Sequence, residues 1–237
     1  MGFNVVEWSL TSLIWIIVAV LAFHVYKNQK EKTKSWKIVL LLLTGIFSFS
    51  FTIPIGGEFI RVAILPLGVM ALAFLFRKKK EKWLVYRKYA WLGFWANYLF
   101  LFASLLSNPI HHAIYPEHLA HTYIAKFDEP SLMMIHPSGE ERIVVQEEFE
   151  DALTTMTFQG DFPPLAWYYE TENHEQTEPR YVEERFPYIV NGVVPKWGSG
   201  IESIVYMEKD GKGIMVSTPD GQYYFRSVQE LFVEGEK

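Results

Sequence analysis

Cysteine is absent from the 237 residues of the sequence. A chain without cysteine has no disulfide framework, no thiol nucleophile and no thiolate metal site, so these kinds of chemistry are excluded. Standard catalytic signatures are missing too: there is no Ser-x-x-Lys, no Gly-x-x-x-x-Gly-Lys loop, and Gly198-Ser199-Gly200 does not extend to Gly-x-Ser-x-Gly. We therefore expect that the chain is not an enzyme.

Acidic residues are scarce in the first part of the chain. Residues 1–106 hold 13 basic and 4 acidic side chains, a net charge of +9, whereas residues 107–237 hold 9 basic and 23 acidic ones, a net charge of −14. An overall composition that is half hydrophobic therefore conceals two different regions. The split predicts two domains, 1–106 and 107–237.

Charged side chains are also missing from long apolar runs in the first domain. The 19 residues from Trp8 to Tyr26 carry no formal charge, which is long enough for a helix to cross a hydrocarbon core of roughly 30 Å. Three further runs predict a bundle of four transmembrane helices, with spans at about 8–26, 38–56, 59–76 and 89–106. The third is the shortest uncharged run, contains Pro66, and needs the Arg61 side chain to extend to the membrane interface.

Two basic clusters predict the orientation of these spans. Five lysines lie between residues 27 and 37, and seven lysines and arginines lie between residues 77 and 88. The positive-inside rule places both clusters in the cytoplasm. We therefore expect an even number of crossings between them, with the N-terminus and residues 107–237 on the extracytoplasmic side of a plasma membrane, which we take as bacterial. No basic residue precedes the first run, which favours a retained helix over a cleaved signal peptide.

The acidic second domain is predicted to be an extracytoplasmic α+β domain with an antiparallel sheet. Its 131 residues are enough to bury a core. Turn sequences between apolar runs predict a three-stranded meander over Ile201–Glu208, Gly213–Thr218 and Gln222–Ser227. The other expected elements are a helix within 116–127, a hairpin within 131–149, loops with one or two short strands over 160–200, and a short helix that begins with a capping box at Ser227 and Glu230.

A histidine cluster is the one feature that suggests metal chemistry. It follows the fourth span and comprises His111, His112, His118 and His121. His118 and His121 are three residues apart, so on a helix they would share a face and could bind Zn or another divalent metal. The segment has no His-Glu-x-x-His motif. The alternative interpretation is a solvated polar face beside lipid headgroups.

These patterns favour a multi-pass membrane protein over an enzyme. We expect the extracytoplasmic domain to bind a partner or ligand in a regulatory, sensory or accessory role. The partners would be the lipid bilayer and another membrane or extracytoplasmic protein, with no cofactor and no indicated oligomeric state. Nucleic acid is not expected, because the basic clusters lie at the predicted cytoplasmic membrane face. The alternative function is an extracytoplasmic metal-binding or metal-dependent hydrolytic domain that uses the histidine cluster.

Overall fold

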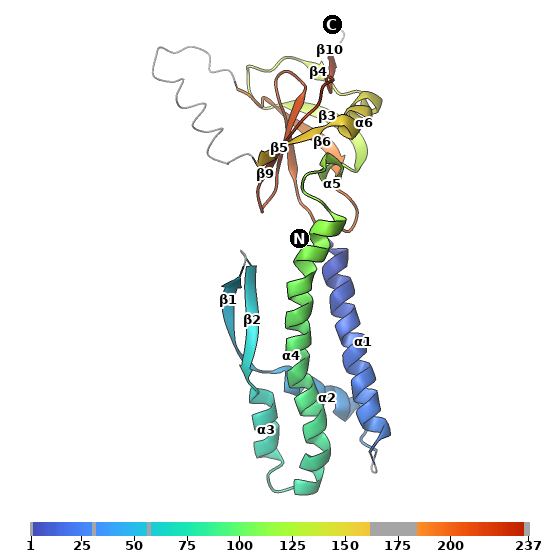
Figure 1. Ribbon diagram of the computed structural model, residues 1–237, viewed down its shortest axis with the longest axis vertical. Helices are drawn as coiled ribbons and strands as arrows, with labels where there is room; N and C mark the ends of the chain where they lie inside the picture. The colour runs from blue at the N-terminus through green and yellow to red at the C-terminus, as the bar shows by residue number, and fades with distance from the viewer. Residues whose placement is uncertain (1, 30–31, 56–57, 162–183, 235–237) are drawn as a thin grey trace, which may run out of the picture. The chain divides into compact units, whose positions relative to one another are not determined.

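The computed structural model describes residues 2–29, 32–55, 58–161 and 184–234 (Figure 1). The chain divides into two compact units. One contains residues 6–110, and we call it the N-terminal unit. The other, the C-terminal unit, combines residues 1–5 with residues 111–237. The division expected at 106/107 lies close to this boundary, whereas the grouping of the first five residues with the C-terminal part was not predicted.

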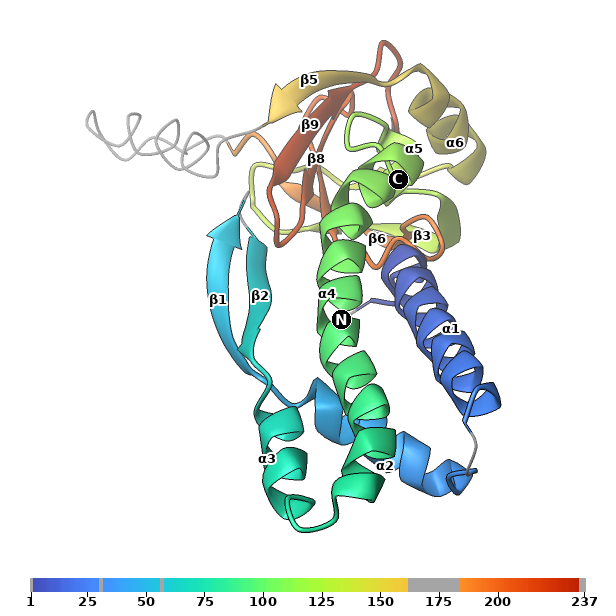
Figure 2. The ribbon, with the colours of Figure 1, turned by 60° about the horizontal axis from the view of Figure 1, so that its bottom comes forward.

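Two long helices dominate the N-terminal unit. They are α1 (Val5–Lys27) and α4 (Lys80–Ile114), the two helices of the described chain that are long and apolar enough to cross a membrane. Ile14, Val18 and Ala22 of α1 are buried at intervals of four residues, which places them on one stripe of the helix. Trp15 of α1 meets Phe100 of α4 with ring centroids 5.4 Å apart. The two helices therefore lie side by side (Figures 1 and 2).

The expected spans at 38–56 and 59–76 are wrong, and with them the four-helix bundle. These residues form α2 (Ser35–Ile46), β1 (Phe49–Ile55), β2 (Glu58–Leu65) and α3 (Leu67–Leu75). At about 1.5 Å per residue, helices of 12 and 9 residues are too short to cross a core of roughly 30 Å. The structure is a mixed fold of helices and sheets instead.

The physical reason is a change of period within the apolar runs. From Phe49 onward, large apolar residues alternate with Ser50, Thr52 and Pro54, the two-residue period of a strand. Pro54 and Pro66 each lack the backbone donor that a continuous helix needs. Strands β1 and β2 pair antiparallel with Ile55 opposite Glu58, so two glycines of the sequence separate the paired residues. Uncharged length alone had concealed this hairpin.

Glycines allow α2 and α4 to cross closely. A Cβ atom on Gly45 would lie 2.1 Å from the carbonyl oxygen of Ala90, and one on Gly93 would lie 2.2 Å from that of Leu42. Small residues at a crossing let helix backbones approach, as in membrane helix pairs. The side-chain amide of Asn97 donates a hydrogen bond to the Ile46 carbonyl oxygen at 3.1 Å, which ties the end of α2 to α4.

The C-terminal unit is built on one six-stranded antiparallel sheet with the strand order β3-β6-β7-β8-β9-β5. Its strands are β3 (Lys126–Met134), β5 (Thr157–Asp161), β6 (Tyr188–Val194), β7 (Ile204–Met207), β8 (Gly213–Ser217) and β9 (Gln222–Arg226). The remaining elements are α5 (Ala120–Tyr123), α6 (Gln146–Thr155) and the short pair β4 (Arg142–Ile143) and β10 (Val233–Glu234). The predicted meander is confirmed as β7-β8-β9.

Other predictions for this unit are wrong. The hairpin expected within 131–149 does not form, because β3 pairs with β6 and Gln146–Thr155 is helical. Phe149, Ala152 and Leu153 have helical spacing and are all buried, which explains why α6 forms there. The helix expected within 116–127 is reduced to α5, and residues 228–234, which the structure describes after Ser227, form no helix. Within 160–200, strand β6 is present and residues 162–183 lie outside the described chain.

Candidate functional site

The turn between β7 and β8 carries an unusual buried acid, Glu208. The backbone closes the turn, because the Glu208 amide donates to the Gly213 carbonyl oxygen at 2.8 Å and the Gly211 amide donates to the Glu208 carbonyl oxygen at 2.9 Å. Gly211 has φ of +69°, a conformation that glycine adopts without a steric penalty. The turn thereby places the Glu208 side chain, which is 11% exposed, beside the end of β9.

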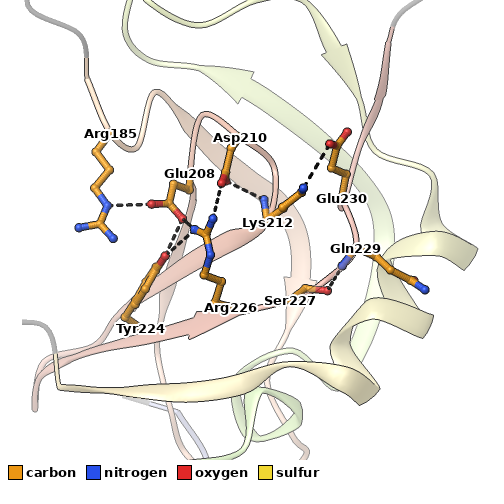
Figure 3. Close-up of polar contacts among 9 residues, drawn as sticks. All are labelled: Arg185, Glu208, Asp210, Lys212, Tyr224, Arg226, Ser227, Gln229 and Glu230. Atoms are coloured by element: carbon orange, nitrogen blue, oxygen red, sulfur yellow. Dashed lines mark hydrogen bonds and ion pairs between the residues drawn. The ribbon is translucent and has the colours of Figure 1, made fainter.

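Both carboxylate oxygens of Glu208 have charged or polar partners (Figure 3). Oε1 accepts from Nε of Arg185 at 2.8 Å. Oε2 accepts from the Tyr224 hydroxyl at 2.6 Å and from Nη1 of Arg226 at 2.5 Å. The other end of the Arg226 guanidinium binds Asp210 at 2.5 Å. We call these five residues the Glu208 cluster, in which two cations balance two anions.

The missing side chain at Gly213 makes room for the Glu208 carboxylate. A Cβ atom on Gly213 would lie 1.9 Å from Oε2 of Glu208. Burial and the neighbouring Glu208 carboxylate raise the pKa of Tyr224, so its hydroxyl remains a donor. Hydrogen bonds to Tyr224 and Asp210 raise the pKa of Arg226 and keep it charged.

The contacts of the Glu208 cluster support a structural role. A general acid or base needs a carboxylate within reach of a substrate proton, whereas both Glu208 oxygens already accept hydrogen bonds. The cluster joins the β7–β8 turn to β9 and to Arg185, which precedes β6.

The Glu208 cluster was not predicted from the sequence, although the register of the predicted meander pointed to it. In the meander, Arg226 lies opposite Gly213, so it must lie near Glu208.

The structure places the four predicted metal-binding histidines in different settings. His111 is half-buried, and its Nε2 lies 2.7 Å from the Ser199 carbonyl oxygen. His112 is exposed with Nδ1 3.3 Å from Glu117, while His118 and His121 are both exposed. In the described chain, no three His, Cys, Asp or Glu side chains are placed to hold one metal ion. Metal binding by these residues stays a prediction.

Glu117 also influences a buried tyrosine on the sheet. Tyr223 stacks on Tyr123 with ring centroids 5.2 Å apart. Burial, followed by the nearby Glu117 carboxylate, raises the pKa of Tyr223 to about 12. The hydroxyl is therefore neutral at physiological pH, and this group contributes no charge to a binding surface.

One loop of the C-terminal unit, residues 196–200, binds the segments that border both long helices. The Val5 amide, at the start of α1, donates to the Gly198 carbonyl oxygen at 2.8 Å. At the end of α4, His111 contacts Ser199, and the Tyr115 hydroxyl donates to the Trp197 carbonyl oxygen at 3.0 Å. The beginning of α1 and the end of α4 therefore lie at the same loop.

The end of the edge strand β3 and the residue after it form an exposed apolar segment. Met133, Met134 and Ile135 are each 42–50% exposed. Among the described strands, β3 pairs only with β6. The Ile135 amide donates a hydrogen bond to the carbonyl oxygen of Pro187, the residue before β6. Because successive amides of a strand point to opposite sides, the amides of Leu132 and Met134 point away from β6. This half of the edge has the features of a strand that can pair with another chain.

Known proteins give no guide to this site. Comparisons of the chain with family models, with curated proteins and with solved structures find no match.

Proposed function

We propose that the chain is an integral membrane protein in which α1 and α4 cross the bilayer and hold the C-terminal unit on the extracytoplasmic face, where it binds a partner protein. The role is regulatory or accessory. One observation carries the membrane assignment, namely the apolar residues that α1 and α4 leave uncovered. Only 22% and 28% of their most apolar windows are buried.

The amount of exposed apolar surface supports lipid as the solvent of the N-terminal unit in this proposal. Eight large apolar side chains of α1 are exposed: Trp8, Leu13, Trp15, Ile16, Ile17, Val20, Leu21 and Phe23. Burying such a side chain stabilises by about 1.5–3 kcal/mol, so lipid contact on this helix alone is worth on the order of 10 kcal/mol. A soluble protein rarely leaves so large an apolar patch uncovered.

The ends of the helices support the proposed two-crossing topology. The 196–200 loop contacts Val5 and His111, so the start of α1 and the end of α4 belong on one side. The opposite ends carry the lysines, at Lys27 of α1 and at the Lys80 end of α4. The positive-inside rule then assigns the lysine-rich ends to the cytoplasm. This arrangement needs no crossing by α2, β1, β2 or α3.

The partner-binding surface in this proposal is the edge of β3. An extended segment of the partner would add antiparallel to Ser131–Ile135, with main-chain hydrogen bonds for affinity and the two methionines as adaptable apolar contacts. Lys126, Asp128, Glu129 and Pro130 protect the first half of the strand from such pairing. The second half lacks charged residues and proline.

Two measurements on membranes test the proposal. The chain is expected to stay in the membrane fraction after alkaline carbonate extraction, and its release would contradict the membrane assignment. A photoreactive amino acid at Met133 is expected to give one discrete crosslinked protein, which the charge introduced by Met134→Lys removes. The matched control is the same photoreactive residue at Val228, which is 86% exposed and far along the sequence. Identical crosslinking at both positions would contradict a β3 binding edge.

A further inference from the structure

The N-terminal unit contains a groove whose lining is about equally polar and apolar. Its volume is about 500 Å³, and it lies between the β1–β2 hairpin, the end of α2 and the second half of α4. The hairpin runs beside α4 in both ribbon views (Figures 1 and 2). The Tyr98 hydroxyl of α4 donates to the Ala63 carbonyl oxygen of β2 at 2.7 Å, which holds the hairpin against the helix.

Arg61 is the one charged residue in the lining. Its Nε donates to the Ser50 hydroxyl at 2.5 Å across the hairpin. Among the residues whose side chains the structure describes, no carboxylate forms an ion pair with Arg61. Ser48, Asn97 and Ser104 add polar groups to the same lining. The groove therefore offers a cation and hydroxyls but no anion.

The position of the groove along α4 decides which part of a lipid Arg61 can meet, and the inference rests on the proposed membrane function. Asn97 and Ser104 lie 9 and 16 residues beyond Lys88, or roughly 14 and 24 Å along the helix. In a hydrocarbon core of roughly 30 Å that begins at Lys88, Ser104 is therefore near the extracytoplasmic headgroups. Arg61 lies two residues beyond Ala63 toward the tip of the hairpin, so its long side chain can extend to that headgroup level. Below that level an unpaired cation would cost several kcal/mol.

We propose that this groove binds one anionic phospholipid, with its phosphate at Arg61. The guanidinium offers a planar set of donors that matches phosphate oxygens, and such charge-assisted hydrogen bonds are the strong ones. The Ser50 hydroxyl, already in contact with Arg61, adds a further polar group at the phosphate. The acyl chains lie along the apolar wall formed by Phe47, Phe100 and Leu101.

The test uses the full chain in nanodiscs of equal parts phosphatidylglycerol and phosphatidylcholine. A phosphatidylglycerol with a photoreactive acyl chain is expected to crosslink to β1, β2 and residues 97–104 of α4. Arg61→Gln should reduce this labelling about tenfold, as expected for the loss of one charge-assisted contact. The matched control is Arg77→Gln, because Arg77 follows α3 and is absent from the lining.

A second variant, which keeps Arg61, tests the groove independently in case Arg61→Gln does not fold. Ser104→Trp fills the groove from α4 without removing charge and should also suppress the labelling. Uniform labelling of α1 and α4, or labelling unchanged by both variants, would overturn the proposal. Equal labelling by photoreactive phosphatidylcholine or by a photoreactive fatty acid would overturn the anionic phospholipid as occupant.

The outcome separates this inference from the proposed function. A chain that resists carbonate extraction but shows no selective labelling retains its membrane assignment and loses the lipid site. A chain that carbonate releases loses both.

Discussion

The two units of this protein differ in which residues they bury. The core of the N-terminal unit contains many small side chains, with Ala22, Ala63, Ala90, Ala96 and Ala103 buried beside Tyr89 and Phe94, while most of its tryptophans are exposed. In the C-terminal unit, large side chains fill the core, among them Tyr123, Phe149, Tyr188 and Phe225. Such a difference is what two different solvents would produce. Water drives large apolar groups inward, whereas lipid leaves close packing as the main source of helix association.

The largest expected difference between the units is in the stability lost when one phenyl ring is removed from each. Phe149→Ala empties a fully buried position of the C-terminal unit, next to Phe127 at a centroid distance of 5.1 Å, and should cost about 4 kcal/mol. Phe23→Ala removes a ring that is 65% exposed on α1 and should change stability by less than about 1 kcal/mol. Denaturant unfolding of the full chain in detergent measures both. Equal losses would break the comparison between the units.

The next effect concerns the Glu208 cluster. Glu208→Gln leaves Arg185 and Arg226 without their shared anion and should destabilise the C-terminal unit by about 3 kcal/mol, the lower end for a broken buried ion pair because both guanidiniums are partly exposed. The control is Glu230→Gln, whose exposed contact with Lys212 is 3.7 Å long and is worth at most about 1 kcal/mol. An equal loss of stability in both variants would contradict the claim that the Glu208 ion pairs stabilise the β7–β8 turn.

A smaller effect should appear at alkaline pH. The folded-state pKa of Tyr223 is raised to about 12 from an ordinary value of 10.0. Folding therefore favours the neutral phenol, and this contribution is fully present below pH 10 and lost as pH rises from 10 to 12, at about 1 kcal/mol per pH unit. Phenolate absorbance and unfolding should both be compared with Tyr223→Phe. An identical pH dependence in the variant would contradict the burial of this hydroxyl.

The smallest effect is expected at the exposed histidines. His118→Ala combined with His121→Ala should leave stability within about 0.5 kcal/mol of the parent chain, because both side chains are exposed. Equilibrium dialysis of the full chain against zinc should give the same bound metal for parent and variant. Stoichiometric zinc that the double change removes would instead support the metal-binding alternative.

Sequence reasoning succeeded where a local signal was enough. The turns around Asp210-Gly211 and Asp220-Gly221 were sufficient to predict the β7-β8-β9 meander. Uncharged length was sufficient for α1 and α4, whose 23 and 35 residues exceed what a span requires. The same criterion was wrong for 38–76, because an uncharged run does not distinguish a helix from a strand and the alternation after Phe49 was not weighed against it.

The tertiary pairings were beyond the sequence patterns. Strand β3 pairs with β6 across more than fifty residues, so the expectation of a local hairpin within 131–149 followed sequence proximity where the fold does not. The Glu208 cluster combines residues from Arg185 to Arg226 and emerges only once the register of β8 and β9 is known. Arg61 was interpreted as a snorkelling side chain of a helix. Its place in the groove depends on the hairpin that replaced that helix.

The most direct test of the account is a labelling experiment that the absence of cysteine makes possible. Single cysteines replace Val228, which is 86% exposed in the C-terminal unit, and Lys79, in the basic segment before α4. A membrane-impermeant maleimide added to intact cells should label the cysteine at 228, and should label the cysteine at 79 only after the membrane is permeabilised. Labelling of position 79 in intact cells, or of both positions only after permeabilisation, would contradict the proposed crossing of α1 and α4.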